Sequence, residues 1–142
     1  MSYKRAINKV VKYINALGVE VNLNSRAWYF DREEEVICGA KNSNELITLC
    51  SLLHEAGHIV QTQSTFECFK STTLRNKAII LEQEYTAWKE GWSIAESLNI
   101  TDSSFERVYR KLWMSCWMSY VTRLTQPDSK EYTRCSVYGY VN

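Results

Sequence analysis

Proline, histidine and closely paired cysteines are scarce in this chain of 142 residues. Pro127 is the only proline, and His54 and His58 are the only histidines. The cysteines number five, which is odd, and no two of them have the C-x-x-C spacing. A secreted disulfide framework would favour an even number, and a zinc cluster made of cysteines would need close pairs. We therefore expect reduced thiols, mostly small hydrophobic residues of the core, in a cytoplasmic protein.

An excess of charge and a long apolar run are missing as well. Lys and Arg number 17 against 16 Asp and Glu, so the formal net charge is +1. That balance argues against a protein that binds nucleic acid by neutralising phosphates. No stretch approaches the roughly 18 apolar residues of a membrane span, and polar residues interrupt positions 1–18 too often for a signal peptide. We expect a soluble protein with no nucleic-acid or membrane partner, and the oligomeric state stays open.

Hydrophobic residues make up 45% of the chain, which is enough to bury the core of one domain. We predict a single domain over residues 1–142, in which residues 126–142 form a C-terminal tail after the boundary that the proline marks. At the other end, apolar side chains at helical spacing predict an amphipathic helix over residues 3–17. Gly18 follows where a helix C-terminal glycine belongs.

The spacing of the apolar residues then changes from the helical period to two. Val19, Val21 and Leu23 alternate with polar residues, which predicts a half-buried strand. Runs at residues 27–30 and 36–38 flank a charged segment, and this pattern predicts a β-hairpin with a solvated turn. The chain should therefore place a small three-stranded sheet after its first helix.

Three further helices are predicted over residues 43–61, 74–99 and 103–124. The first of them is apolar around most of its girth, so it should be buried. Capping boxes are predicted at the N-termini of the first and the last, formed by Asn42 with Glu45 and by Ser103 with Glu106. The order of elements predicts an α+β fold, with one helix and a small sheet before these three helices.

The helix over residues 43–61 contains the sequence His54-Glu55-Ala56-Gly57-His58. Because the two histidines are four residues apart, their side chains leave the same helix face one turn apart. Two imidazoles at this spacing can bind one zinc ion at about 2.0–2.1 Å each. Glu55 is rotated from His54 by about 100°, which places its carboxylate beside the metal, where a metal-bound water would lie.

A catalytic zinc ion takes three protein ligands and keeps one position for water. No third histidine exists, so the third ligand must be a carboxylate or a cysteine. On the helix over residues 74–99, Glu84 shares its face with apolar residues, whereas Glu82 lies on a more mixed face. We choose Glu84 as the ligand and keep Glu82 as the alternative, although either could be a solvated surface charge. Gly57, between the two histidines, would let a second helix approach closely.

The His54-Glu55-x-x-His58 pattern resembles the active-site helix of zincin metallopeptidases, and Glu84-x-x-Ala-Trp88 resembles the glutamate helix of their gluzincin branch. The small size is similar to that of minimal gluzincins and of short metallopeptidase-like proteins of phage type, and the likeness spans about residues 1–98. It implies a zincin-like fold with an active-site helix and a glutamate helix, Zn²⁺ as cofactor and a protein or peptide substrate. Larger gluzincins often carry an Asp where this chain has Trp88, and they supply a histidine or tyrosine to the oxyanion.

These patterns predict a zinc-dependent metallopeptidase that hydrolyses peptide bonds. His54, His58 and Glu84 would hold the metal, and Glu55 would be the catalytic base that activates a zinc-bound water. The main alternative is a zinc-binding regulatory or interaction module of phage type without turnover, and a metal-free structural protein is a third. The presence of Glu55 favours catalysis, because metal binding alone does not need it.

Three details of such an enzyme are open in the sequence. The substrate would pair with an exposed edge of the sheet, which we place at residues 36–38. The C-terminal tail could fill the cleft, as in a zymogen, or simply pack against the body. Four tyrosines are candidates for stabilising the oxyanion, although each could instead be an aromatic residue of the core or the surface: Tyr120, Tyr132, Tyr138 and Tyr140.

Overall fold

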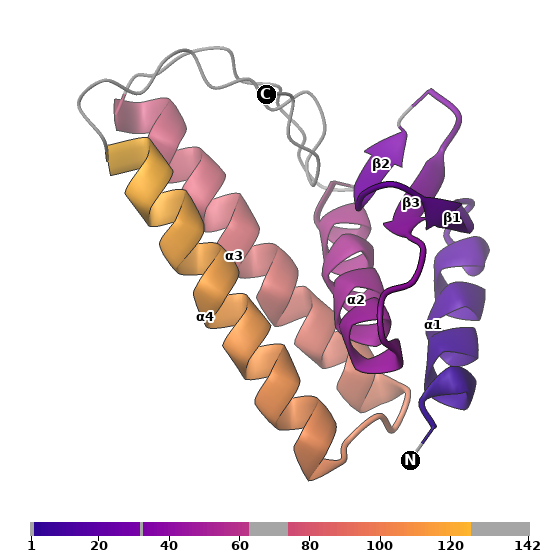
Figure 1. Cartoon of the computed structure of the whole chain (residues 1–142). Coiled ribbons are helices and arrows are strands. Elements are labelled where there is room, and N and C mark those ends of the chain that lie inside the picture. Colours follow the sequence, from indigo (N-terminus) through magenta and orange to yellow (C-terminus); the bar gives the residue numbers. More distant parts are fainter. Residues whose placement is uncertain (1, 32, 63–73, 126–142) are drawn as a thin grey trace.

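The computed structural model describes residues 2–31, 33–62 and 74–125. Within these ranges the chain forms four helices and three strands (Figure 1). In order they are α1 (Lys4–Ala16), β1 (Glu20–Ser25), β2 (Tyr29–Asp31), β3 (Val36–Ala40), α2 (Glu45–Thr62), α3 (Leu74–Ser97) and α4 (Ser103–Thr125). The expected α+β class, with one helix and a small sheet before three helices, is confirmed.

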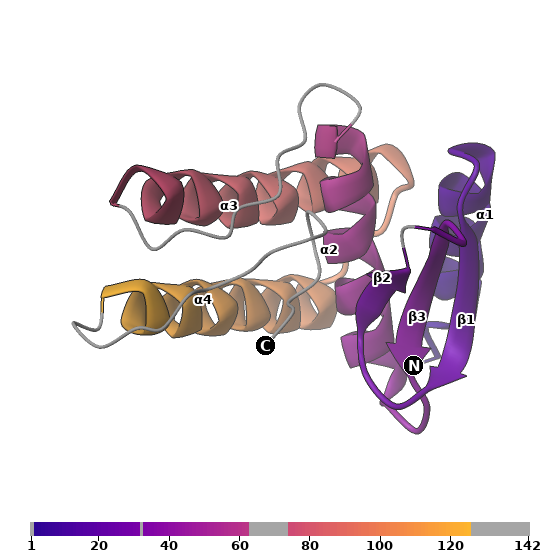
Figure 2. The same cartoon turned by 90° about the horizontal axis from the view of Figure 1, so that it is seen from above.

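Helix α2 lies in the middle of the molecule. Helix α1 and the sheet lie on one side of α2, and α3 and α4 run side by side on the other (Figures 1 and 2). Apolar side chains of α2 are completely buried at five positions, because both sides of the helix are covered: Leu49, Cys50, Leu52, Leu53 and Ala56. The apolar girth of this segment in the sequence therefore reflects its central position.

The three-stranded sheet has the order β1-β3-β2. Strand β3 pairs in parallel with β1 and antiparallel with β2, so the predicted hairpin between β2 and β3 is confirmed. The prediction that residues 36–38 form an exposed edge is wrong. These residues belong to β3, which is the central strand and is hydrogen-bonded to β1 on one side and to β2 on the other. A continuous apolar run is typical of such a strand, and Ile37 and Cys38 are both buried.

Helix α1 covers the sheet with the apolar stripe that the sequence predicts. Val10 and Ile14 on this stripe are completely buried. Gly18 follows the helix with a φ of 86°, a left-handed conformation that costs glycine little because it has no Cβ. The predicted end of the first helix is thereby confirmed.

The cap of α2 lies two residues later than predicted. Asn44, and not Asn42, caps the helix, because the backbone N–H of Ile47 donates to Asn44 Oδ1 at 2.8 Å. Asn42 instead has a φ of 65° in the turn after β3. The Glu45 carboxylate accepts a bond from the backbone N–H of Tyr3 at 2.6 Å, so it fastens the start of the chain to α2.

The cap of α4 is also displaced, by one residue. The backbone N–H of Phe105 donates to Asp102 Oδ1 at 2.8 Å, so Asp102 takes the place predicted for Ser103. The predicted capping box of Ser103 with Glu106 is therefore wrong. Asp102 also accepts a bond from the Tyr3 hydroxyl at 3.0 Å, and this long-range contact favours capping by Asp102.

Helices α2 and α3 approach each other closely at two glycines. A Cβ on Gly57 would run into the carbonyl oxygen of Ala87, and a Cβ on Gly91 would lie 2.6 Å from the carbonyl oxygen of Leu53. Only glycine permits backbone contact of this kind. The role predicted for Gly57, as the point where a second helix approaches, is confirmed.

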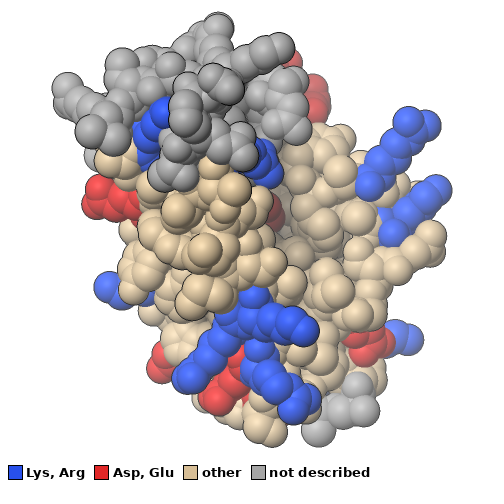
Figure 3. Space-filling view, turned by 60° about the vertical axis from the view of Figure 1, so that its left-hand side comes forward, with Lys and Arg blue, Asp and Glu red and all other residues tan. Residues whose placement is uncertain are grey.

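The face formed by α3 and α4 has charged groups of both signs (Figure 3). Basic side chains gather near the lower end of this view, with acidic side chains among them. Helix α4 exposes Arg107, Arg110 and Lys111 to solvent. Of the helices in the described ranges, none combines the length and the apolar character that a membrane span needs. The predicted C-terminal tail at residues 126–142 lies outside the described residues.

Candidate metal centre

The central helix α2 carries three ionisable side chains into the interior of the protein. His58 is completely buried, Glu55 is 4% exposed, and the side chain of His54 is 13% exposed. Buried imidazole and carboxylate groups are costly unless they have partners. The apolar neighbours on the same helix hold these groups in the core, and the two imidazoles have a partner on one of the helices packed against α2.

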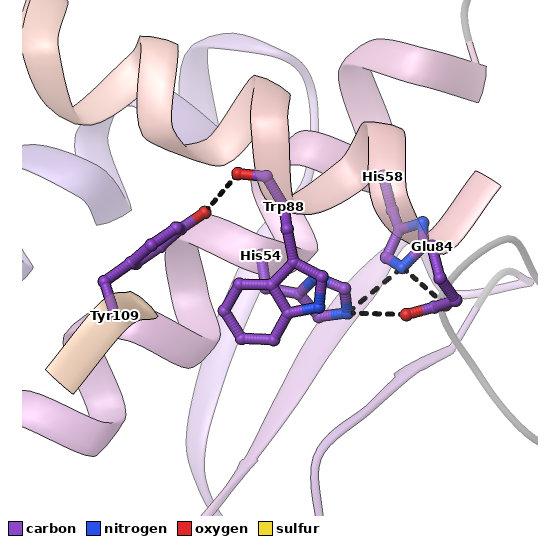
Figure 4. Close-up of polar contacts among 5 residues, drawn as sticks. All are labelled: His54, His58, Glu84, Trp88 and Tyr109. Carbon is purple, nitrogen blue, oxygen red and sulfur yellow. Dashed lines mark hydrogen bonds and ion pairs between the residues drawn. The ribbon is translucent and has the colours of Figure 1, made fainter. Parts of the chain in front are cut away.

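That partner is Glu84 of α3, whose carboxylate is 2% exposed and faces both imidazoles (Figure 4). Glu84 Oε1 lies 3.0 Å from His58 Nε2, and Glu84 Oε2 lies 3.4 Å from His54 Nε2. The two Nε2 atoms are 3.2 Å apart. The structure thus brings together the three residues that the sequence singles out as ligands.

The dimensions of this group fit a metal ion. Two ligand atoms at about 2.0–2.1 Å from a tetrahedral zinc ion are separated by about 3.3 Å. The distance between the two Nε2 atoms, 3.2 Å, lies near that value, and so do the distances of 3.0 and 3.4 Å from the two Glu84 oxygens, one to each imidazole. With a single oxygen of Glu84, the three ligand atoms all lie within 4.8 Å of one another. Imidazole nitrogen and carboxylate oxygen suit several divalent metals. His54, His58 and Glu84 can therefore hold a metal ion, with one ligand atom from each.

Glu82, the alternative ligand, is exposed to solvent. Two residues along a helix correspond to a rotation of about 200°, so α3 cannot direct Glu82 and Glu84 to the same side. The buried position of Glu84 agrees with its place on the apolar face of α3. The structure leaves Glu82 as a surface charge.

Glu55 and Glu84 lie close enough to act on the same thiol of α4. Burial raises the pKa of Cys116 to about 11, and the negative charges of Glu84 and then Glu55 add to the rise. Cys116 is a free thiol, as the sequence predicts, and it packs against the core. The influence of the two carboxylates on this thiol was not predicted, because spacing on α4 alone does not show which helix the apolar face of α4 packs against.

Trp88 is a further residue of the site, to which the sequence analysis gave no role. Its indole stacks on the His54 imidazole with ring centroids 4.2 Å apart and an interplanar angle of 21° (Figure 4). The Tyr109 hydroxyl of α4 donates to the carbonyl oxygen of Trp88 at 2.5 Å. A signal existed in the spacing, since Trp88 is one helical turn after Glu84 and shares its face.

Of the tyrosines considered for the oxyanion, only Tyr120 lies within the described residues. It is buried against Ile80, near Ile79 and Leu81, about one turn before Glu84 along α3. The other three fall in the undescribed tail. The structure therefore places Tyr120 of α4 in a small apolar cluster with residues of α3.

The apolar cavity between α3 and α4 is separate from this centre. It has a volume of about 420 Å³ and is lined by Tyr85, Arg110, Trp113, Met114 and Trp117. None of His54, Glu55, His58 or Glu84 lines it. An apolar pocket is the usual first candidate for a ligand site, but here the ionisable groups converge elsewhere, at His54, His58 and Glu84.

Comparisons of this chain with models of protein families, with curated proteins and with solved structures find no match. The residues of the centre itself are therefore the basis on which its chemistry is considered.

Proposed function

We propose that this protein is a zinc-dependent metallopeptidase with a zincin-like fold, related to the gluzincin branch, which hydrolyses peptide bonds of a protein or peptide in the cytoplasm. The observation that carries the proposal is the convergence of two imidazoles from α2 and one carboxylate from α3 at separations of 3.0–3.4 Å. A fourth ionisable group, Glu55, is buried on the same helix as the imidazoles.

His54 and His58 would hold the ion through Nε2, and Glu84 would hold it through a carboxylate oxygen. Bound zinc supplies a Lewis acid that lowers the pKa of a water molecule towards about 7 and polarises the carbonyl group to be attacked. With three protein ligands, the group would resemble catalytic rather than structural zinc sites, which take four.

Glu55 supplies the proton transfer that hydrolysis needs. Its carboxylate would accept a proton from the attacking water as the water oxygen bonds to the carbonyl carbon. As the C–N bond breaks, Glu55 would pass that proton to the leaving amine, so the carboxylate is regenerated.

A peptide-library digest of the full chain tests the proposal. We expect zinc-loaded wild type to cleave peptides, and a chelator to abolish cleavage. Glu55→Gln should bind zinc as wild type does but lose about 10²–10⁴-fold in turnover, the usual contribution of a general base. Glu82→Gln is the matched control, because it removes an exposed carboxylate and should keep full activity.

The same experiment separates the alternative, a zinc-binding regulatory or interaction module without turnover. One zinc per chain with no cleavage of any library peptide would favour that module. Full turnover in Glu55→Gln would contradict the mechanism, and a chain that binds no zinc would contradict both functions.

A further inference from the structure

One face of the His54 ring is covered by the indole of Trp88. The rings are 4.2 Å apart and nearly parallel, and Trp88 is 3% exposed. Histidines that bind metals are normally oriented by a hydrogen bond from their second ring nitrogen. Among the described residues, His54 Nδ1 is buried and has no hydrogen-bond partner. Another contact must therefore fix the plane of this ring.

Trp88 is itself held firmly enough to do so. The ring of Tyr109 meets the indole edge to face, with centroids 5.1 Å apart and an interplanar angle of 76°. The Tyr109 hydroxyl donates to the Trp88 carbonyl oxygen, and burial raises the pKa of Tyr109, so the hydroxyl keeps its proton. A Cβ on Gly91 would collide with that hydroxyl, so this glycine leaves the space that Tyr109 occupies.

We propose that Trp88 is a positioning residue, which holds the His54 imidazole by stacking so that Nε2 points at His58 and Glu84. This inference rests on the proposed zinc site. Trp88 would do by ring contact what a hydrogen-bond acceptor does for other ligand histidines. Because Trp88 follows Glu84 by one turn, α3 would supply both a ligand and the support of a ligand on α2 (Figure 4).

The physical effect is a smaller loss of conformational freedom when the metal binds. An imidazole that can rotate about its side-chain bonds must be immobilised on binding, which costs free energy. A ring already fixed by stacking avoids much of that cost. Loss of the groups that support a ligand histidine typically weakens metal binding by about 10–100-fold, and we expect the same range for loss of the Trp88 ring.

Zinc affinity, measured by competition with a chromophoric chelator, tests the inference. Trp88→Leu should bind zinc about 10–100-fold more weakly than wild type, and Trp88→Phe, which keeps an aromatic face, should recover most of the loss. Trp92→Leu is the matched control on the same helix, because Trp92 stacks on Phe105 and not on a ligand. Equal affinity in Trp88→Leu and wild type, or an equal loss in Trp92→Leu, would overturn the inference.

A second measurement uses the metal-free protein and does not depend on activity. Stacking on indole shifts the ring C–H resonances of His54 upfield in NMR spectra. Trp88→Leu should remove this shift, whereas Trp92→Leu should keep it. If Trp88→Leu does not fold, the wild-type spectrum and the Trp88→Phe affinity decide, and unshifted His54 resonances in folded wild type would overturn the inference.

The two proposals fail in different ways. Wild type that binds zinc and cleaves peptides, together with an unchanged affinity in Trp88→Leu, removes only the role of Trp88. Wild type that binds no zinc removes the proposed function and this inference with it.

Discussion

Glu84 and Tyr85 are neighbours on α3, but they lie in opposite environments. The Glu84 carboxylate is buried against two imidazoles of α2. Tyr85 is 48% exposed, and its ring lies 5.4 and 5.9 Å from those of Trp113 and Trp117 on α4. One residue, or about 100° of helix rotation, separates a buried ionisable centre from a partly exposed aromatic surface.

The difference shows that the two faces of α3 differ in how exactly their partners must be placed. A buried carboxylate is stable only while its partners stay at close distance. The α2-facing side of α3 therefore needs a fixed approach, which Gly57 and Gly91 permit. Contacts between partly exposed aromatic rings tolerate small shifts, because dispersion and hydrophobic effects have little directionality. Changes on the inner face should have large effects, and changes on the outer face small ones.

Removal of zinc should have the largest effect on the free energy of unfolding, because the proposed ligands all lie between α2 and the α2-facing side of α3. If free zinc exceeds its dissociation constant by a thousandfold, binding stabilises the folded state by about 4 kcal/mol. When a chelator replaces zinc, we expect the free energy of unfolding of wild type to fall by that amount. The midpoint of urea unfolding should move to a lower urea concentration accordingly. His58→Ala should unfold at one midpoint in both conditions. If the wild-type midpoint is the same with zinc and with the chelator, the proposed distinction between the two faces of α3 is contradicted.

Gly57→Ala comes next, because its Cβ would collide with the Ala87 carbonyl oxygen. Overpacking of this kind costs about 1–3 kcal/mol, and we expect the upper end since backbone must move. Helix propensity alone predicts the opposite sign, a gain of about 1 kcal/mol. Urea unfolding therefore decides between them, with Ser93→Ala on the exposed side of α3 as control. A more stable Gly57→Ala variant would show that the helices do not touch here.

The cap of α2 should contribute less, because it lies at the helix end. Asn44→Ala should lower the free energy of unfolding by about 1 kcal/mol, the usual value of an N-cap. Asn42→Gly should lose nothing of this kind, since glycine tolerates the positive φ at that position. Thermal unfolding of both variants gives the comparison. A larger loss of unfolding free energy in Asn42→Gly than in Asn44→Ala would indicate that Asn42, and not Asn44, caps α2.

The smallest effect is expected on the outer face. Met114 is 61% exposed beside the aromatic cavity, and Met114→Ser should change the free energy of unfolding by no more than about 0.5 kcal/mol. Its zinc affinity should equal that of wild type. A loss as large as that of Gly57→Ala would mean that the outer face is as constrained as the inner one.

The elements and the cluster of His54, His58 and Glu84 were predictable from the sequence, because periodicity and spacing determine on which face of a helix a side chain lies. The i, i+4 spacing of His54 and His58 puts them on one face of any helix, and the apolar neighbours of Glu84 direct it inward. Both arguments need only the geometry of one helix at a time.

The features that the sequence did not show depend on contacts between distant segments. Residues 36–38 became the central strand because β1 pairs with β3, and single-strand patterns contain no strand order. Asp102 became the cap of α4 while it also accepts a bond from Tyr3, a partner far away in the chain. Trp88 stacks on His54 only because α3 packs on α2. The charges of Glu84 and Glu55 act on Cys116 only because α4 packs on the same body.

The central claim is that one zinc ion lies between α2 and α3 and is held by two imidazoles and a carboxylate. X-ray absorption at the zinc edge, on the full chain loaded with one equivalent, tests it most directly. The account predicts only nitrogen and oxygen neighbours at about 2.0–2.1 Å, including two imidazole rings, with one imidazole lost in His58→Ala. A sulfur neighbour at about 2.3 Å, or an unchanged spectrum in His58→Ala, would contradict it.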